Sequence, residues 1–113
     1  MYSSEGGIRV PLIVRYPPFA RHQQIDNTFY TVMDLAPTIY EMAGVQHPGR
    51  VYHGKEILPL RGKSLLGYFS DRKTQEVHDE GYTMGWELAG NAAVRKGNWK
   101  ITFVSKPKGK RVV

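Results

Sequence analysis

The sequence of 113 residues is long enough for one ordinary domain or for a piece of a larger one, and it is too short for two domains. Apolar residues make up 41% and charged residues 23%, which is typical of a globular chain and excludes wholesale disorder. No apolar run approaches the roughly 18 to 20 residues that span a bilayer, and no signal-peptide segment follows Met1, so we expect no membrane partner. The absence of cysteine excludes disulfides and a cysteine nucleophile within these residues. Periplasmic, secreted and cytoplasmic locations all stay open.

The net charge of +6 is confined to one end of the sequence. Residues 1–94 hold nine basic and ten acidic side chains, so this part is nearly neutral. The remaining residues carry no acid, and their basic side chains are Arg95, Lys96, Lys100, Lys106, Lys108, Lys110 and Arg111. A short basic run of this kind is typical of a solvated connection, and it predicts weak, salt-sensitive contact with polyanions.

Residues 8–15 are predicted to form a strand. Apolar side chains fall on both of its faces, which is typical of a strand that is covered on both sides in a parallel α/β sheet. No other segment resembles a parallel neighbour, so we expect the rest of that sheet to lie outside this sequence.

A helix is predicted over residues 34–43. Asp34 can cap its start, and Pro37 falls in the first turn, where no backbone donor is lost. Gly44 is suited to end it. The spacing of its apolar residues predicts one buried stripe, which consists of Leu35, Ile39 and Met42.

The second half of the sequence predicts an irregular connection, a short helix and a hairpin. Residues 45–62 are rich in glycine and proline, and residues 63–69 follow as a short helix. Residues 92–104 predict a hairpin with a type II′ turn at Gly97-Asn98. Alternation places Trp99, Ile101 and Phe103 on one face, which we expect to be a core face. The expected fold class is α+β, with a small antiparallel sheet of about three to four strands packed with one main helix.

Four segments resemble motifs of the sulfatase family, in the alkaline-phosphatase-like superfamily. Residues 5–11 resemble its E-G-G-x-R-x-P segment, residues 34–44 its D-L-x-P-T helix, and residues 62–66 its G-x-S-L-L element. Residues 85–100 are similar to the C-terminal hairpin of bacterial-type arylsulfatases. Four motifs in the family's order make the resemblance specific. Structural roles are expected for Glu5, Gly6, Gly7, Arg9, Pro11, Asp34, Pro37, Gly44, Gly97 and Trp99.

The resemblance implies the C-terminal part of an alkaline-phosphatase-like α/β sulfatase fold. Residues 1–44 would end the large domain, and residues 45–113 would form most of a C-terminal subdomain. The parent enzyme would hydrolyse sulfate esters with a formylglycine nucleophile and a calcium ion, and its remaining chain would be the partner of these residues. The formylglycine would come from Cys or Ser in a C/S-x-P-x-R motif.

That machinery is not found in this sequence. The nearest match to the nucleophile motif, Ser105-Lys106-Pro107-Lys108-Gly109, has glycine in place of the arginine. The pair Asp26-Asn27 follows the E-G-G segment, whereas the metal-binding pair of the family precedes it. We therefore expect no catalytic residue, no metal ligand and no cofactor within this chain, and we expect the fragment to be inactive.

A short acidic segment and one tryptophan are candidates for the mouth of the parent's active site. They are His78, Asp79, Glu80 and Trp86. Loops before a hairpin often carry specificity residues, although a solvated polar turn has the same composition. Trp86 could stack on a ring-bearing substrate or could belong to the core.

Two other functions are left open. The strand Trp99-Lys100-Ile101-Thr102-Phe103, with the basic end, could form a small module that binds nucleic acid or an anionic glycan, because it interleaves aromatic residues with lysines. Its aromatic residues share a face with Ile101, as in a core, so we expect no nucleic acid. Phosphate and phosphonate ester hydrolases share the superfamily scaffold, and the chain could also be a fragment of one of these.

Overall fold

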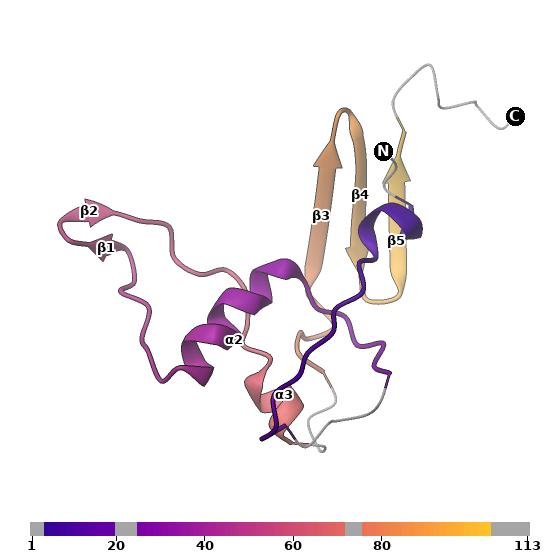
Figure 1. The fold of residues 1–113 in the computed structure, drawn as a ribbon. Helices are drawn as coiled ribbons and strands as arrows, with labels where there is room; N and C mark the ends of the chain where they lie inside the picture. Colours follow the sequence, from indigo (N-terminus) through magenta and orange to yellow (C-terminus); the bar gives the residue numbers. More distant parts are fainter. Residues whose placement is uncertain (1–3, 20–24, 72–75, 105–113) are drawn as a thin grey trace, which may run out of the picture. The chain divides into compact units, whose positions relative to one another are not determined.

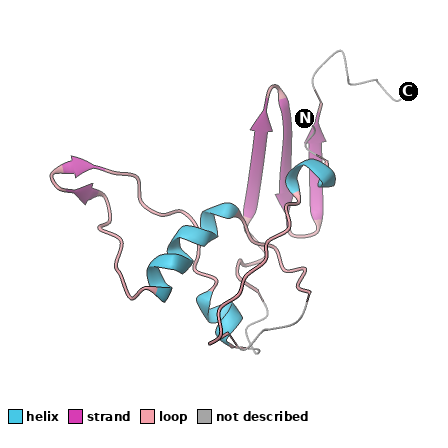
Figure 2. Cartoon of the chain, in the orientation of Figure 1, coloured by secondary structure: helices cyan, strands magenta, loops and turns pink. Residues whose placement is uncertain are grey.

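The computed structural model describes residues 4–19, 25–71 and 76–104 (Figure 1). Its helical elements are α1 (Glu5–Ile8), the 3-10 turn η1 (Val32–Asp34), α2 (Leu35–Met42) and α3 (Leu66–Ser70). Its strands are β1 (Val51–Tyr52), β2 (Lys55–Glu56), β3 (Thr83–Leu88), β4 (Asn91–Lys96) and β5 (Trp99–Phe103). Both sheets are antiparallel, one pairing β1 with β2 and the other ordered β3-β4-β5 (Figure 2). The expected α+β class with a small antiparallel sheet is confirmed.

The chain forms two compact units. One consists of residues 1–14 and 80–113, and the other of residues 15–79. The domain boundary that we expected after residue 44 falls inside the second unit, and the division at that point stays a prediction. Among the described residues, no helix combines the length and the apolar character needed to cross a membrane.

Two tight turns connect the three-stranded sheet. Lys96 pairs with Trp99, so the turn between β4 and β5 consists of Gly97 and Asn98 as predicted, and Gly97 has the positive φ of 54° that a type II′ turn needs. Between β3 and β4 the turn consists of Ala89 and Gly90, with φ of 52° and 77°. Positive φ at both central residues is the signature of a type I′ turn, which matches the twist of the flanking strands.

The predicted helix is formed, and it ends where the sequence indicates. Gly44 has a φ of 64° and donates its N–H to the backbone carbonyl of Glu41. The N–H of Val45 donates to the carbonyl of Tyr40 at 3.0 Å. This pair of bonds is a Schellman motif, which satisfies carbonyls that the end of a helix leaves without partners.

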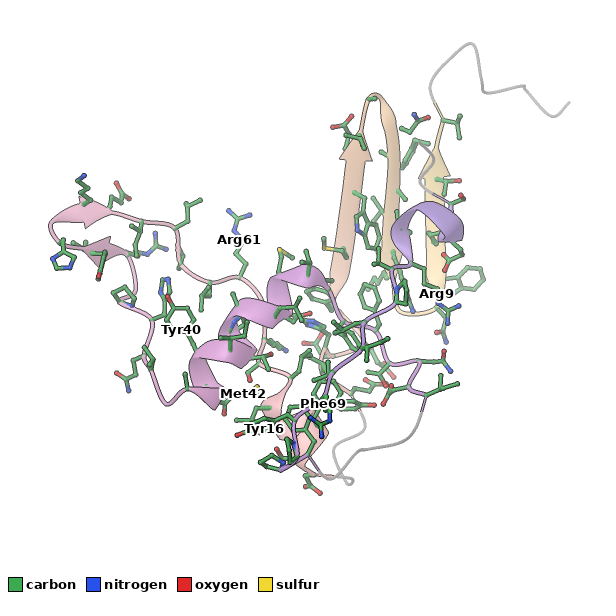
Figure 3. All side chains as sticks on the ribbon, in the orientation of Figure 1. Arg9, Tyr16, Tyr40, Met42, Arg61 and Phe69 are labelled. Atoms are coloured by element: carbon green, nitrogen blue, oxygen red, sulfur yellow. The ribbon has the colours of Figure 1, made fainter. Side chains whose placement is uncertain are left out.

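The hydrophobic core of the second unit lies around α3. Its buried members are Phe19, Leu65, Tyr68 and Phe69, and Leu35 and Met42 of α2 pack against them. Tyr16 also packs against this core, and Figure 3 shows it close to Met42 of α2 and Phe69 of α3. The predicted stripe of α2 is wrong at one position, because Ile39 is 65% exposed and the polar residue Thr38 is buried in its place.

Two further expectations are not met. The strand predicted over residues 8–15 is not formed, because α1 extends to Ile8 and the following residues pair with no described strand. A strand depends on its neighbours for backbone hydrogen bonds, and here Val10 and Ile13 are 78% and 94% exposed. The predicted core face of β5 is also exposed, with Trp99 at 84% and Phe103 at 54%.

The turn between β3 and β4 predicts a stabilising substitution. Ala89 holds a left-handed conformation that costs a side chain with a Cβ about 1 kcal/mol, and asparagine tolerates this region better. We expect Ala89→Asn to raise the free energy of unfolding in urea by about 0.5–1 kcal/mol. The control is Asn98→Ala in the other turn, which should give no gain. An Ala89→Asn variant that unfolds at lower urea than the parent chain would contradict the type I′ assignment.

Candidate functional site

The carboxylate of Asp34 accepts hydrogen bonds from three segments of the second unit. Its side chain is fully buried at 0% exposure. Oδ1 accepts the backbone N–H of Lys63 at 2.8 Å, and Oδ2 accepts the N–H of Thr31 at 2.6 Å and its hydroxyl at 3.1 Å. Nε2 of His78 lies 2.9 Å from the same Oδ2, and it must donate because an ionised carboxylate only accepts.

Asp34 therefore does not cap α2 in the way that its position predicts. Thr31 is the N-cap of the preceding turn η1, and Asp34 occupies its third position. The two side chains close a capping box, in which the carboxylate turns back to the N–H of Thr31. The signal was present in the sequence as Thr31 followed three residues later by an acid, with aspartate in place of the usual glutamate.

Thr38 makes a second link between the same two segments. Its hydroxyl donates to the carbonyl of Asp34 at 2.5 Å and accepts the backbone N–H of Leu65 at 2.8 Å. Thr38 is buried, at 6% exposure. The segment of residues 63–65, which directly precedes α3, thus donates two backbone N–H groups to the side chains of residues 34 and 38. These contacts join the D-L-x-P-T helix to the G-x-S-L-L element.

Gly62 permits this close approach of the two segments. A Cβ placed on this residue would lie 2.1 Å from the carbonyl oxygen of Met33 and 2.7 Å from the backbone nitrogen of Asp34. Both atoms belong to the backbone, so no side-chain rotation could relieve the clash. The first residue of the G-x-S-L-L element is therefore glycine for a packing reason.

The electrostatics of Asp34 are those of a satisfied buried anion. Burial by itself raises the pKa of a carboxyl, but the hydrogen bonds from His78, Thr31 and Lys63 outweigh it and hold the pKa of Asp34 below its ordinary value. The group is thus an ionised, fully coordinated carboxylate at neutral pH. Donors from Thr31, Lys63 and His78 meet at this carboxylate, so the arrangement ties three chain segments together and serves as a tether.

The residues predicted to shape a substrate mouth occupy different surroundings. His78 is buried at 7% exposure and belongs to the Asp34 network, with the ring of Phe29 6.5 Å away. Asp79 is exposed and its carboxylate lies 3.6 Å from the amine of Lys63. Glu80 and Trp86 belong to the other compact unit. Their role at a substrate mouth stays a prediction.

A metal ion needs several ligand side chains grouped around one point. In residues 4–19, 25–71 and 76–104, no three His, Asp or Glu side chains are grouped so as to hold an ion. These residues do not fit the calcium ion that the family resemblance implies for the parent. The pseudo-motif that begins at Ser105 lies outside the described residues.

Comparison with known proteins gives the class of the chain. A family model, the C-terminal region of N-sulphoglucosamine sulphohydrolase, matches residues 1–106. The chain therefore belongs to this sulfatase family, and the resemblance drawn from its four motifs is confirmed.

Individual relatives agree with this assignment. An uncharacterized sulfatase of Schizosaccharomyces pombe is 45% identical over 105 residues, which cover 93% of this chain and 19% of that protein. An arylsulfatase of Klebsiella aerogenes is 40% identical over 63 residues, or 56% of this chain and 13% of the enzyme. The human steryl-sulfatase is 40% identical over 62 residues, or 53% of this chain and 11% of the enzyme. The chain thus spans less than a fifth of the length of each of these relatives.

The tether predicts a large effect of a small substitution. Asp34→Asn preserves the side-chain volume but replaces one carboxylate oxygen by an NH2 group, which cannot accept a hydrogen bond. Buried donors that now face this NH2 group lose their acceptor, so we expect the free energy of unfolding to fall by about 2–4 kcal/mol. The matched control is Asp79→Asn, which removes an acid from the exposed ion pair with Lys63 and should have a much smaller effect. Urea denaturation measures both. Equal effects of the two variants would show that Asp34 does not hold the segments together.

The same carboxylate predicts a dependence of stability on pH. Because the pKa of Asp34 in the folded chain lies below its ordinary value of 3.8, the unfolded chain binds this proton more readily. Its stabilising contribution is therefore present above about pH 4 and is lost as the pH falls through the folded pKa. Urea midpoints measured between pH 6 and pH 2 should fall more steeply for the unaltered chain than for Asp34→Asn. Parallel curves would contradict the assignment.

Proposed function

We propose that this chain is the C-terminal structural part of a sulfate-ester hydrolase and that it has no turnover by itself. The observation that carries the proposal is the family match over residues 1–106, together with the use of two family motifs as an internal tether. Asp34, Thr38 and His78 are buried in this tether. The carboxylate of Asp34 bonds to Nε2 of His78 and to backbone N–H groups, and the hydroxyl of Thr38 bonds to backbone groups, which supports a role in organising the chain.

The chemistry of the whole enzyme would come from residues outside this chain. In the proposed parent, a formylglycine and a divalent metal would supply the nucleophile and the charge stabilisation for attack on a sulfate ester. In the part of the chain that the structure describes, no three His, Asp or Glu side chains are grouped so as to hold an ion, and the sequence contains no cysteine. The chain would complete the fold, and its loop before β3 would approach the substrate mouth.

Residues 9–15, which belong to the strand predicted over residues 8–15, support a structural role. The segment follows α1 without regular structure, and its apolar side chains Val10 and Ile13 are 78% and 94% exposed. We propose that it becomes a covered strand in the sheet of the parent's large domain, which would satisfy its backbone and bury these side chains.

A chimera tests the proposal. The matched region of the Schizosaccharomyces pombe relative would be replaced by this chain, and hydrolysis of an aryl sulfate would be measured for the chimera, the relative and the isolated chain. We expect turnover by the relative and the chimera and none by the isolated chain. Turnover by the isolated chain at a rate near that of the relative would overturn the proposal.

An aryl phosphate is assayed in parallel. It tests the alternative that the parent is a phosphate ester hydrolase on the same scaffold. A chimera that hydrolyses only the phosphate ester would overturn the sulfatase assignment of the activity, while leaving the structural role of this chain in place.

A further inference from the structure

We propose that one face of the sheet β3-β4-β5 is the surface on which the rest of a sulfatase chain docks. This face, called the Trp99 face here, is formed by cross-strand neighbours on the same side of the sheet. It consists of Thr83, Gly85 and Glu87 of β3, Ala92, Val94 and Lys96 of β4, and Trp99, Ile101 and Phe103 of β5. The inference rests on the proposed function and adds the place of contact.

The apolar residues of the Trp99 face lie on the surface of the chain. Trp99 is 84% exposed, Ile101 62%, Phe103 54% and Val94 38%. Val94 and Ile101 are adjacent because they pair directly across β4 and β5. Trp99 and Phe103 lie on the same face of β5 because each is two residues from Ile101. A contiguous exposed apolar patch is often an interaction surface.

The opposite face of the same sheet is already in use. Ala93 is fully buried and Asn91 is 6% exposed, and both point away from the Trp99 face because side chains alternate along β4. Lys100 also points to that side, where it pairs with Glu5. An antiparallel sheet usually leaves one face polar and solvated, whereas the second face here is apolar as well.

The charge of the Trp99 face argues against a nucleic acid as its partner. Exposed Trp99 and Phe103 could stack on bases, but a binding groove for single strands also needs several cations to follow the phosphates. Among the strand residues on this face the charged ones are Lys96 and Glu87, whose charges cancel. A surface that is apolar and neutral fits an apolar protein surface.

The size of the Trp99 face argues against a second copy of this chain. The three strands lie about 4.8 Å apart, and each is some six residues long with a rise of about 3.4 Å per residue. One face of the sheet therefore has an area of roughly 300 Å². A stable dimer buries about 800 Å² on each partner. A face of this size is therefore sufficient only when the partner is held nearby by other contacts or by the same polypeptide. The relatives carry four-fifths or more of their length outside the matched region, which supplies such a partner.

Thiol labelling tests this surface, and the natural absence of cysteine makes it clean on this chain. Ile101→Cys is prepared in the isolated chain and in the chimera described above, and the rate of reaction with a maleimide is followed by peptide mass spectrometry. We expect rapid labelling in the isolated chain and at least about tenfold slower labelling in the chimera, because docking removes the side chain from water. Val94→Cys on the same face should behave alike.

The control is Asn98→Cys in the turn between β4 and β5, which should react equally in both proteins. Labelling of Ile101→Cys that is equally fast in an active chimera overturns the docking surface and leaves the proposed function standing. An inactive chimera in which Ile101→Cys is protected supports the docking surface and counts against the proposed function. Protection in the isolated chain that grows with its concentration, or that appears on adding single-stranded DNA, overturns the choice of partner.

Discussion

The burial of one carboxylate is the constraint on which the rest of the second unit depends. Removing an anion from water costs several kcal/mol unless hydrogen bonds replace the lost solvation. Asp34 is fully buried. The hydrogen bonds that replace water at its carboxylate come from Thr31, from the backbone of Lys63 and from His78. Three segments that are far apart in the sequence must therefore meet at one point.

Several local features follow from that meeting point. The loop before α3 has to approach the start of α2 closely enough for backbone N–H groups to reach Asp34 and Thr38, and only a glycine at position 62 leaves room for it. The same approach places Leu65 in the core, at 1% exposure. The two family motifs thus form the two halves of one packing contact, which explains why they carry an acid, a threonine and a glycine.

The parts of the fold that depend on local sequence could be predicted. The glycine at position 44 and the two-residue turn at Gly97-Asn98 have few alternative conformations, so the end of α2 and the hairpin β4-β5 were expected correctly. The sulfatase family was recognised from motifs whose order is specific. Where the conformation of a residue is determined by its neighbours in the sequence, it can be predicted from the sequence alone.

The parts that depend on distant partners could not be predicted. Residues 8–15 have the composition of a buried strand, but composition does not supply the neighbours that make a strand. Alternation in β5 placed the apolar residues Trp99, Ile101 and Phe103 on one face, but it could not tell whether that face is buried, and in this structure it is exposed. The burial of Asp34 and His78 was missed because polar residues on a helix and in a loop are usually assigned to solvent.

Native-state hydrogen exchange at the backbone amide of Lys63 tests the central claim most directly. Lys63 lies in an exposed loop, so its N–H has one reason to be protected, namely its bond to Asp34. We predict that this amide opens with a free energy close to that of the core amide of Leu65, and that Asp34→Asn abolishes the protection. An amide that exchanges at the rate of a solvated loop in the unaltered chain would contradict the account.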